Sequence, residues 1–352
     1  MKVNLEKWYR CKIDKQSLIE LTKKSDWQGI KHILIWVVAL VISGYFAYLT
    51  WGTWWTVFWF LIYGNIFIAS NPVWHETGHK TAFKSDWLNS TFYHIGSFMF
   101  NLEPIRWRWS HFNHHSHTLS TANPYDYEIQ ITKPTDLIYF FLLLIPGGSF
   151  FSFYKLFYSF HVETIKHALG FTTKVMHDCI PEKQRPKCRF WARIHVILWI
   201  SIILYSILIT SWLPIIYILC QYFYGNTLRN VFDIMQHAGL ANNVKDHRLS
   251  TRTVILNPIF SFLYWHMEYH MEHHMFPTVP SYNLPKFTNL LKIKFHLLKM
   301  VYGMHIRKLF LQLSSKQEIQ IIKLMFYFQI QKISNDVKYW YNWLRTYFRN
   351  IF

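Results

Sequence analysis

Residues 33–79 read ILIWVVALVISGYFAYLTW, GT, WWTVFWFLIYGNIFIASNPVW and HETGH in succession. The two apolar stretches, 33–51 and 54–74, carry no charged residue, and each is close to the roughly 20 residues that an α-helix needs to cross a bilayer. Only Gly52 and Thr53 separate them, so the sequence predicts a tight helical hairpin in a membrane. The chain leaves that hairpin directly into His75-Glu-Thr-Gly-His79, which we call box 1.

The composition agrees with a membrane protein. Hydrophobic residues make up 51% of the 352 and charged residues 16%, whereas a soluble domain has about 25% charged residues. The net charge of +18 is typical of positive-inside bias and attraction to anionic lipid. Docking of an acidic protein partner is the alternative interpretation of this charge. We predict no nucleic-acid partner.

A second hairpin is predicted over 194–212 and 213–228, with an uncharged turn between the two stretches. The first 32 residues hold eight Lys and Arg against four Asp and Glu, and residues 161–193 hold seven against three. The positive-inside rule then places both segments in the cytoplasm. We therefore expect four transmembrane helices in two hairpins.

The apolar stretch 137–154 is predicted to lie in the interface or to re-enter the membrane without crossing it. Its Pro146-Gly147-Gly148 centre would break a helix. A single crossing here would also put the histidines that follow it on the opposite side from those that precede it. Without that crossing, all of them belong to one cytoplasmic helical cap.

Two further histidine clusters follow box 1. Box 2 is His111-Phe-Asn-His114-His115, and box 3 is His270-Met-Glu-His273-His274. On an α-helix, residues three and four apart share a face, so each box presents its imidazoles together. Imidazole is a common nitrogen ligand for iron, copper, zinc and nickel, and this many exceeds what one ion can use. With His237 as a ninth member, the predicted ligands of a two-metal site are His75, His79, His111, His114, His115, His237, His270, His273 and His274.

Four other residues lie close enough in sequence to support these ligands from outside. Glu76 lies within box 1, and Asp233 lies one helical turn before His237. His117 and His266 lie near boxes 2 and 3. Outer residues of this kind orient metal-bound imidazoles. For Asp233, a direct or water-mediated contact with a metal is an alternative.

Box 1 also matches HExxH, the signature in which a zinc metalloprotease uses its glutamate as general base. Catalytic zinc takes three protein ligands and leaves one position open. This interpretation leaves boxes 2 and 3 without a role, so it stands as a remote alternative of a different enzyme class.

The three boxes, placed after apolar hairpins, resemble those of the integral-membrane fatty acid desaturase superfamily over roughly residues 30–300. The run Tyr269-His-Met-Glu-His-His-Met-Phe-Pro277 and the sequence from Gln236-His237 to Ser250-Thr-Arg-Thr are similar to those of a bacterial subgroup. This resemblance implies a non-haem diiron centre held by the nine histidines. It also implies that O₂ and two electrons are consumed in oxidising an unactivated C–H bond.

The function that we expect is fatty acyl desaturation, the introduction of a C=C bond. A hydroxylase or oxygenase, or a desaturase of a small specialised metabolite, would have the same ligands. The substrate is then a membrane lipid or acyl chain, carried as phospholipid, acyl-CoA or acyl-carrier protein. The four cysteines form no CxxC pair, and no fused redox module is visible. Electrons are therefore expected from a separate donor such as ferredoxin or cytochrome b5.

The predicted architecture is an all-α, multi-pass integral membrane protein with its active site on the cytoplasmic side. We treat residues 1–352 as one desaturase-like domain with a core of about residues 30–300. Residues 301–352 mix aromatic side chains with Lys and Arg, which predicts an amphipathic interfacial tail.

Overall fold

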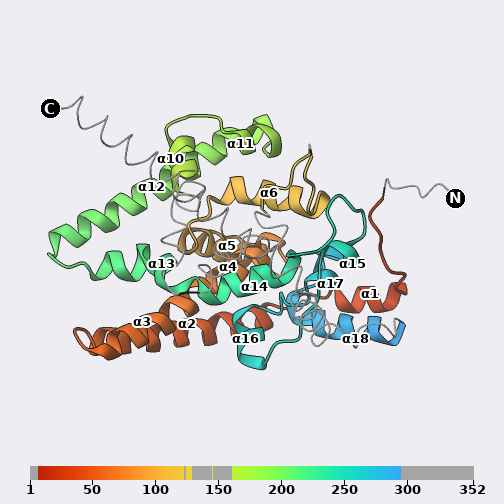
Figure 1. Ribbon diagram of the computed structural model, residues 1–352, viewed down its shortest axis with the longest axis horizontal. Helices are drawn as coiled ribbons and strands as arrows, with labels where there is room; N and C mark the ends of the chain where they lie inside the picture. The colour runs from red at the N-terminus through yellow and green to blue at the C-terminus, as the bar shows by residue number, and fades with distance from the viewer. Residues whose placement is uncertain (1–6, 123, 129–144, 146–160, 295–352) are drawn as a thin grey trace, which may run out of the picture. The chain divides into compact units, whose positions relative to one another are not determined.

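The structure is a computed structural model that describes residues 7–122, 124–128, 145 and 161–294 of the chain (Figure 1). These residues are mostly helical and form no β-strand; an isolated antiparallel bridge joins Thr253 to Tyr269. The predicted all-α class is confirmed. The chain divides into two units, Met1–Leu291 and Lys292–Phe352. The predictions for 301–352 and, Ile145 excepted, for 137–154 lie outside the described residues.

The helices of the described residues are, in chain order, α1 (Lys15–Leu21), α2 (Asp26–Leu49), α3 (Trp54–Ile68), α4 (Ser70–Gly78), α5 (Asp86–Met99), α6 (Pro104–Ser116), α10 (Glu163–Ala168), α11 (Lys174–Cys179), the 3₁₀-helix η2 (Glu182–Gln184), α12 (Arg185–Leu208), the π-helix η3 (Ile215–Leu219), α13 (Gln221–Gly225), α14 (Thr227–His237), α15 (His247–Ser250), α16 (Pro258–Leu263), α17 (His270–Met275), the 3₁₀-helix η4 (Ser281–Asn283) and α18 (Leu284–Lys294).

The first hairpin is formed by α2 and α3, which pack side by side (Figure 1). Ser25 caps the start of α2, since its hydroxyl accepts the backbone N–H of Gln28 at 3.4 Å. The turn after α2 uses Gly52 at φ 84°, a left-handed conformation that glycine adopts without steric cost. Large apolar side chains face outward from both helices; Val41 is 63% exposed and Trp54 is 92% exposed. An outer surface of this kind suits contact with lipid.

Box 1 begins almost directly after the first hairpin. Only Ala69 separates α3 from α4, and His79 is the C-terminal cap of α4. Three stretches of the described residues are long and apolar enough to cross a membrane, namely Lys15–Leu49, Trp54–Gly78 and Glu182–Leu208. They contain the whole of the predicted span 54–74, and most of the predicted spans 33–51 and 194–212.

The predicted fourth span, 213–228, is not one helix in the structure. It consists of η3, α13 and the first residues of α14. Gly225 ends α13 against Gly64 of α3; a Cβ atom at position 225 would lie 2.2 Å from the carbonyl carbon of Gly64. Small residues permit such close backbone approach between helices in membranes. The expectation of one regular helix here is therefore wrong.

Boxes 2 and 3 lie on helices with well-defined starts. Glu103 caps α6 by accepting the N–H groups of Ile105 at 3.0 Å and Arg106 at 2.6 Å, and Pro104 occupies the first turn. The short helix α17 follows the bridge at Tyr269, where the chain pairs with the segment after α15. Each box is helical, as its spacing predicts.

Candidate metal centre

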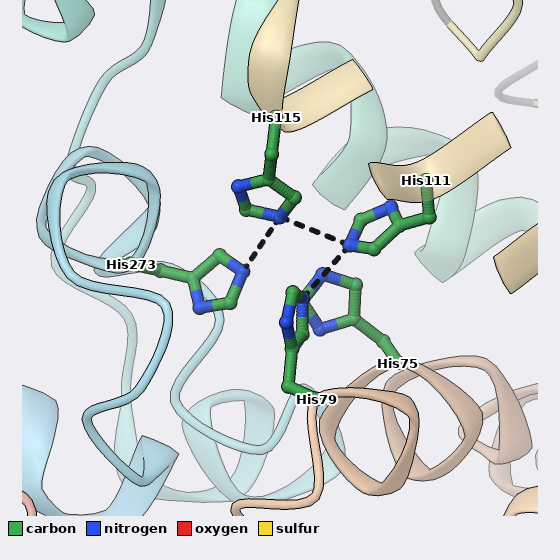
Figure 2. A group of neighbouring side chains, drawn as sticks. All are labelled: His75, His79, His111, His115 and His273. Atoms are coloured by element: carbon green, nitrogen blue, oxygen red, sulfur yellow. Dashed lines mark hydrogen bonds between the residues drawn. The ribbon is translucent and has the colours of Figure 1, made fainter. Parts of the chain in front are cut away.

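Five of the nine histidines form one group, which we call the five-histidine group. Their ligand nitrogens all lie within 4.8 Å of one another, and the rings point toward a common centre (Figure 2). The members come from α4 and its cap, from α6 and from α17: His75, His79, His111, His115 and His273.

The spacing in this group fits a shared metal ion. The Nε2 atom of His111 lies 2.9 Å from Nε2 of His79 and 3.0 Å from Nε2 of His115. Nε2 of His273 lies 3.2 Å from Nε2 of His115. Two imidazole nitrogens bound at right angles to one ion at about 2.1 Å are about 3.0 Å apart. The arrangement therefore has the geometry of a ligand set.

The other four histidines form the four-histidine group, in which every side chain is buried: His114, His237, His270 and His274. The Nε2 atom of His270 lies 2.9 Å from Nε2 of His237 and 3.0 Å from Nε2 of His274. The two groups adjoin, since the rings of His115 and His274 stack with centroids 4.3 Å apart.

Helix geometry explains how the boxes are shared between the groups. In box 2 the first and last histidines, His111 and His115, belong to the five-histidine group, whereas His114 belongs to the four-histidine group. Box 3 is divided in the opposite sense, with His273 alone in the five-histidine group. Positions i and i+4 thus serve one centre while i+3 serves the other, because i+3 lies about 100° away from i+4 on the helix.

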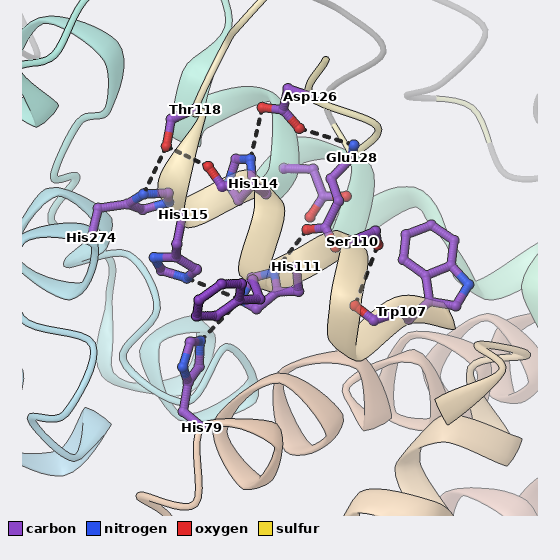
Figure 3. Close-up of polar contacts among 12 residues, drawn as sticks. His79, Trp107, Ser110, His111, His114, His115, Thr118, Asp126, Glu128 and His274 are labelled. Atoms are coloured by element: carbon purple, nitrogen blue, oxygen red, sulfur yellow. Dashed lines mark hydrogen bonds and ion pairs between the residues drawn. The ribbon is translucent and has the colours of Figure 1, made fainter. Parts of the chain in front are cut away.

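Two carboxylates hold the rings of box 2 from outside. His111 contacts the Oε2 atom of Glu128 through Nδ1 at 2.7 Å, and His114 contacts the Oδ2 atom of Asp126 through Nδ1 at 2.8 Å (Figure 3). A proton on Nδ1 leaves Nε2 with a free lone pair for a metal. Burial opposes ionisation of Asp126, but His114 and backbone N–H groups outweigh it and lower the pKa of Asp126 to about 2.

Two further rings are oriented by neutral acceptors. The Nδ1 atom of His237 lies 2.8 Å from the carbonyl oxygen of Ser250. The hydroxyl of Thr118 donates to the carbonyl oxygen of His114 at 2.8 Å, so it can accept from Nδ1 of His274 at 3.3 Å (Figure 3). Each contact leaves Nε2 facing the group.

Burial keeps the remaining imidazoles neutral. It lowers the pKa of His237 to about 3. Burial, followed by the neighbouring imidazoles, also lowers the pKa of His115, His273 and His274 well below the usual value. Neutral imidazole is the form that binds metals. The charge state and the geometry therefore both fit metal binding.

The four residues predicted to support the ligands make their hydrogen bonds elsewhere. Among the described residues, Glu76 accepts the backbone N–H of Ser281 at 3.0 Å, and Asp233 pairs with Arg229 at 2.5 Å. Asp233 is drawn to Arg229 because the two lie four residues apart on α14.

His117 contacts Asn113 at 3.1 Å, and His266 contacts the hydroxyl of Ser261 at 2.8 Å. Neither histidine is a member of the two groups.

The supporting carboxylates Asp126 and Glu128 were not among the sequence predictions. They lie 12 and 17 residues after the imidazoles that they contact, in a segment without helical periodicity. The available signal was two acids with one residue between them, shortly after box 2.

Comparison with known proteins places the chain in a family. The family model for fatty acid desaturase matches residues 49–305, which include all nine histidines. A search of curated proteins finds no match. Because the matched region is well over half of the chain, the protein belongs to the fatty acid desaturase family.

Proposed function

We propose that the nine histidines hold two iron ions, one in each group, and that the protein introduces a C=C bond into a fatty acyl chain. Membership of the family supports a membrane desaturase or oxygenase. The observation that carries the finer proposal is the division of nine imidazoles into two adjoining groups of five and four. A single-ion enzyme has no use for that division.

The iron ions would supply the oxidising power to remove two hydrogens from adjacent carbons; O₂, two electrons and two protons, together with those two substrate hydrogens, would leave as two water molecules. The protein's own residues prepare the centre for this role. Asp126 and Glu128 keep Nδ1 protonated and Nε2 free on their histidines. Burial of the four-histidine group excludes water that would compete for the ions.

The position of box 1 supports an acyl substrate. The helix that carries His75 follows α3 after a single residue, at the end of a stretch long enough to cross a membrane. An acyl chain in the bilayer could then reach the ions without leaving an apolar environment. We propose a phospholipid, acyl-CoA or acyl-carrier protein as the carrier of that chain.

We further propose four membrane crossings with the metal centre on the cytoplasmic side. The fourth crossing would combine η3, α13 and part of α14, packed on the first hairpin. The hydroxyl of Tyr217 donates to the carbonyl oxygen of Gly44 at 2.8 Å, and that of Tyr63 donates to the carbonyl oxygen of Tyr217 at 3.2 Å. These contacts support a segment that is irregular yet fixed against α2 and α3.

The electrons would come from a separate protein such as ferredoxin or cytochrome b5. The described residues show three possible metal-binding groups and none that holds an iron–sulfur cluster through several cysteines. The chain's net charge of +18 would favour docking of an acidic donor.

The test is expression in a host that lacks its own desaturases, followed by mass spectrometry of the lipids and metal analysis of the purified protein. We expect about two iron ions per chain and a lipid that has lost two hydrogens. A lipid that has gained one oxygen would show that the reaction is hydroxylation and not desaturation. If iron-loaded protein with its donor acted on a small metabolite and not on lipid, the proposal of an acyl substrate would be wrong.

The same measurements decide the HExxH alternative. A zinc protease would contain about one zinc ion per chain and would work without O₂. Such a result would overturn the diiron proposal. The contact of Glu76 with the backbone of Ser281 gives that alternative no support, because a general base must face the open position of the zinc.

A further inference from the structure

A second cluster of possible metal ligands lies outside the two histidine groups. It consists of Glu103 at the start of α6, His167 on α10 and Cys188 on α12. One atom of each lies within 4.8 Å of the others, and all three side chains are at most 1% exposed. No residue of this cluster is used by the proposed reaction.

The separation of the sulfur and the nitrogen in this cluster matches a tetrahedral zinc site. The Sγ atom of Cys188 lies 3.6 Å from Nδ1 of His167 and 3.0 Å from Oε2 of Glu103. A sulfur and a nitrogen bound to one zinc ion at about 2.3 and 2.05 Å are about 3.6 Å apart at the tetrahedral angle. A carboxylate oxygen and a sulfur bound to the same ion would be about 3.5 Å apart, so Oε2 of Glu103 would have to move away from the sulfur by about 0.5 Å.

Each ligand is already held in place by a neighbour. The Nε2 atom of His167 lies 2.8 Å from the hydroxyl of Thr173, so Nδ1 faces the thiol. Glu103 is fixed by the backbone N–H groups of Ile105 and Arg106 at the start of α6. The cluster is therefore organised in advance of binding, as supported ligands of a metal are.

We propose that Glu103, His167 and Cys188 bind a single zinc-class cation that fastens α10 and α12 to α6. A cysteine ligand selects a soft or borderline metal over magnesium or calcium. A thiolate and a carboxylate together neutralise a divalent ion, so the buried site carries no net charge. The fourth position would be taken by a water molecule, whereas most structural zinc ions have four protein ligands.

Burial has opposite effects on the acid and the imidazole in the absence of an ion. It raises the pKa of Glu103 to about 7 and lowers the pKa of His167 to about 4. Burial also raises the pKa of the Cys188 thiol. Binding of a cation would therefore release two protons, one from the acid and one from the thiol, and the neutral imidazole would need no change. Oxidation of Cys188 is a weaker interpretation, because its side chain is 0% exposed.

The position of the site suggests what the ion would stabilise. Arg106, three residues after Glu103, contacts Glu163 of α10 at 2.8 Å and Ser110 at 2.8 Å. Ser110 in turn donates to Glu128 at 3.0 Å, and Glu128 contacts His111. The ion would thus hold the helix that carries box 2 in register with its supporting carboxylates.

Cobalt titration of the purified full-length protein tests the proposal, because cobalt replaces zinc and reports a sulfur ligand by a thiolate-to-metal charge-transfer band in the near ultraviolet. The nine-histidine centre contains no thiolate, so this band can come only from a cysteine. We expect the band to saturate at about one cobalt per chain. Added zinc should abolish it.

The variant Cys188→Ala should lose the band and the bound zinc. Cys220→Ala is the matched control and should behave as wild type, since Cys220 lies outside the cluster. His167→Gln serves as a second variant and should lower the affinity for cobalt at least about tenfold.

Wild-type protein without a charge-transfer band, or a band that survives Cys188→Ala, would overturn the proposal. Neither readout depends on turnover, so the proposed zinc site is tested separately from the desaturase function.

Discussion

The two histidine groups differ in how firmly their rings are held. In the four-histidine group, three of four rings have an outer partner: His114 with Asp126, His237 with the carbonyl of Ser250, and His274 with Thr118. In the five-histidine group, the Nδ1 atoms of His75, His115 and His273 have no hydrogen-bond partner among the described residues. Glu128 supports His111.

This difference indicates two ways to hold an ion. The four-histidine group would hold its ion with few ligands whose orientation is fixed. The five-histidine group would hold its ion with more ligands that are less firmly oriented. Loss of one ligand leaves three imidazoles in the first case and four in the second. We therefore expect the four-histidine group to be the more sensitive of the two to a single substitution.

The largest effect should come from removing a ligand of the smaller group. His270→Ala deletes the ring that contacts both His237 and His274. We expect activity to fall by more than about 100-fold, beyond the usual range for outer partners, and iron to fall from about two to about one per chain. Metal analysis and a lipid assay measure both quantities.

His79→Ala is the matched change in the larger group and should retain more iron than His270→Ala. His94→Ala is the control, since His94 stacks on Trp191 and belongs to neither group. Equal iron loss in the two ligand variants would contradict the expectation that the four-histidine group is the more sensitive one.

The next effect should come from Asp126→Asn. The amide keeps the size of the side chain and can still accept the N–H of Leu119, which Asp126 accepts at 2.9 Å. It removes the negative charge that holds the proton on His114. We expect the affinity for iron to fall about 10- to 100-fold, measured as the rate of iron loss to a chelator. Unchanged iron retention would show that orientation of His114 does not depend on Asp126.

Glu128→Gln applies the same change to the larger group and should have a smaller effect. It removes the charge facing His111, one of five ligands rather than one of four. We expect a loss of iron affinity near the lower end of the range, about tenfold, in the same chelation assay. A greater loss here than in Asp126→Asn would reverse the ranking of the two groups.

Spacing within each box predicted that its histidines share a helical face, and the structure brings all nine together. The division into five and four was not predictable in the same way. Which group each histidine joins depends on how α6 and α17 are placed relative to each other and to the other histidine-bearing segments, which tertiary packing sets. His237 was found because it follows an apolar segment, whereas Asp126 and Glu128 lie in a loop without any periodic signal.

The membrane segments show the same limit. Long uncharged runs such as 33–51 predicted helices that the structure contains. In 213–228, hydropathy alone predicted a regular helix. The contact between Gly225 and Gly64 and the contacts of Tyr217 with the first hairpin instead fix an irregular path. These contacts join residues far apart in sequence, so no local pattern reveals them.

The smallest effect should come from Thr118→Val, which removes a neutral hydrogen bond without changing the shape of the side chain. Its hydroxyl lies 3.3 Å from Nδ1 of His274, longer than the 2.8 Å contact of Asp126 with His114. A neutral hydrogen bond contributes about 0.5–1.5 kcal/mol, so iron affinity should fall about two- to tenfold. Thr118→Ser restores the hydroxyl and should recover wild-type retention. A loss as large as that of Asp126→Asn would mean that the number of oriented rings matters in the four-histidine group, and the charge of their partners does not.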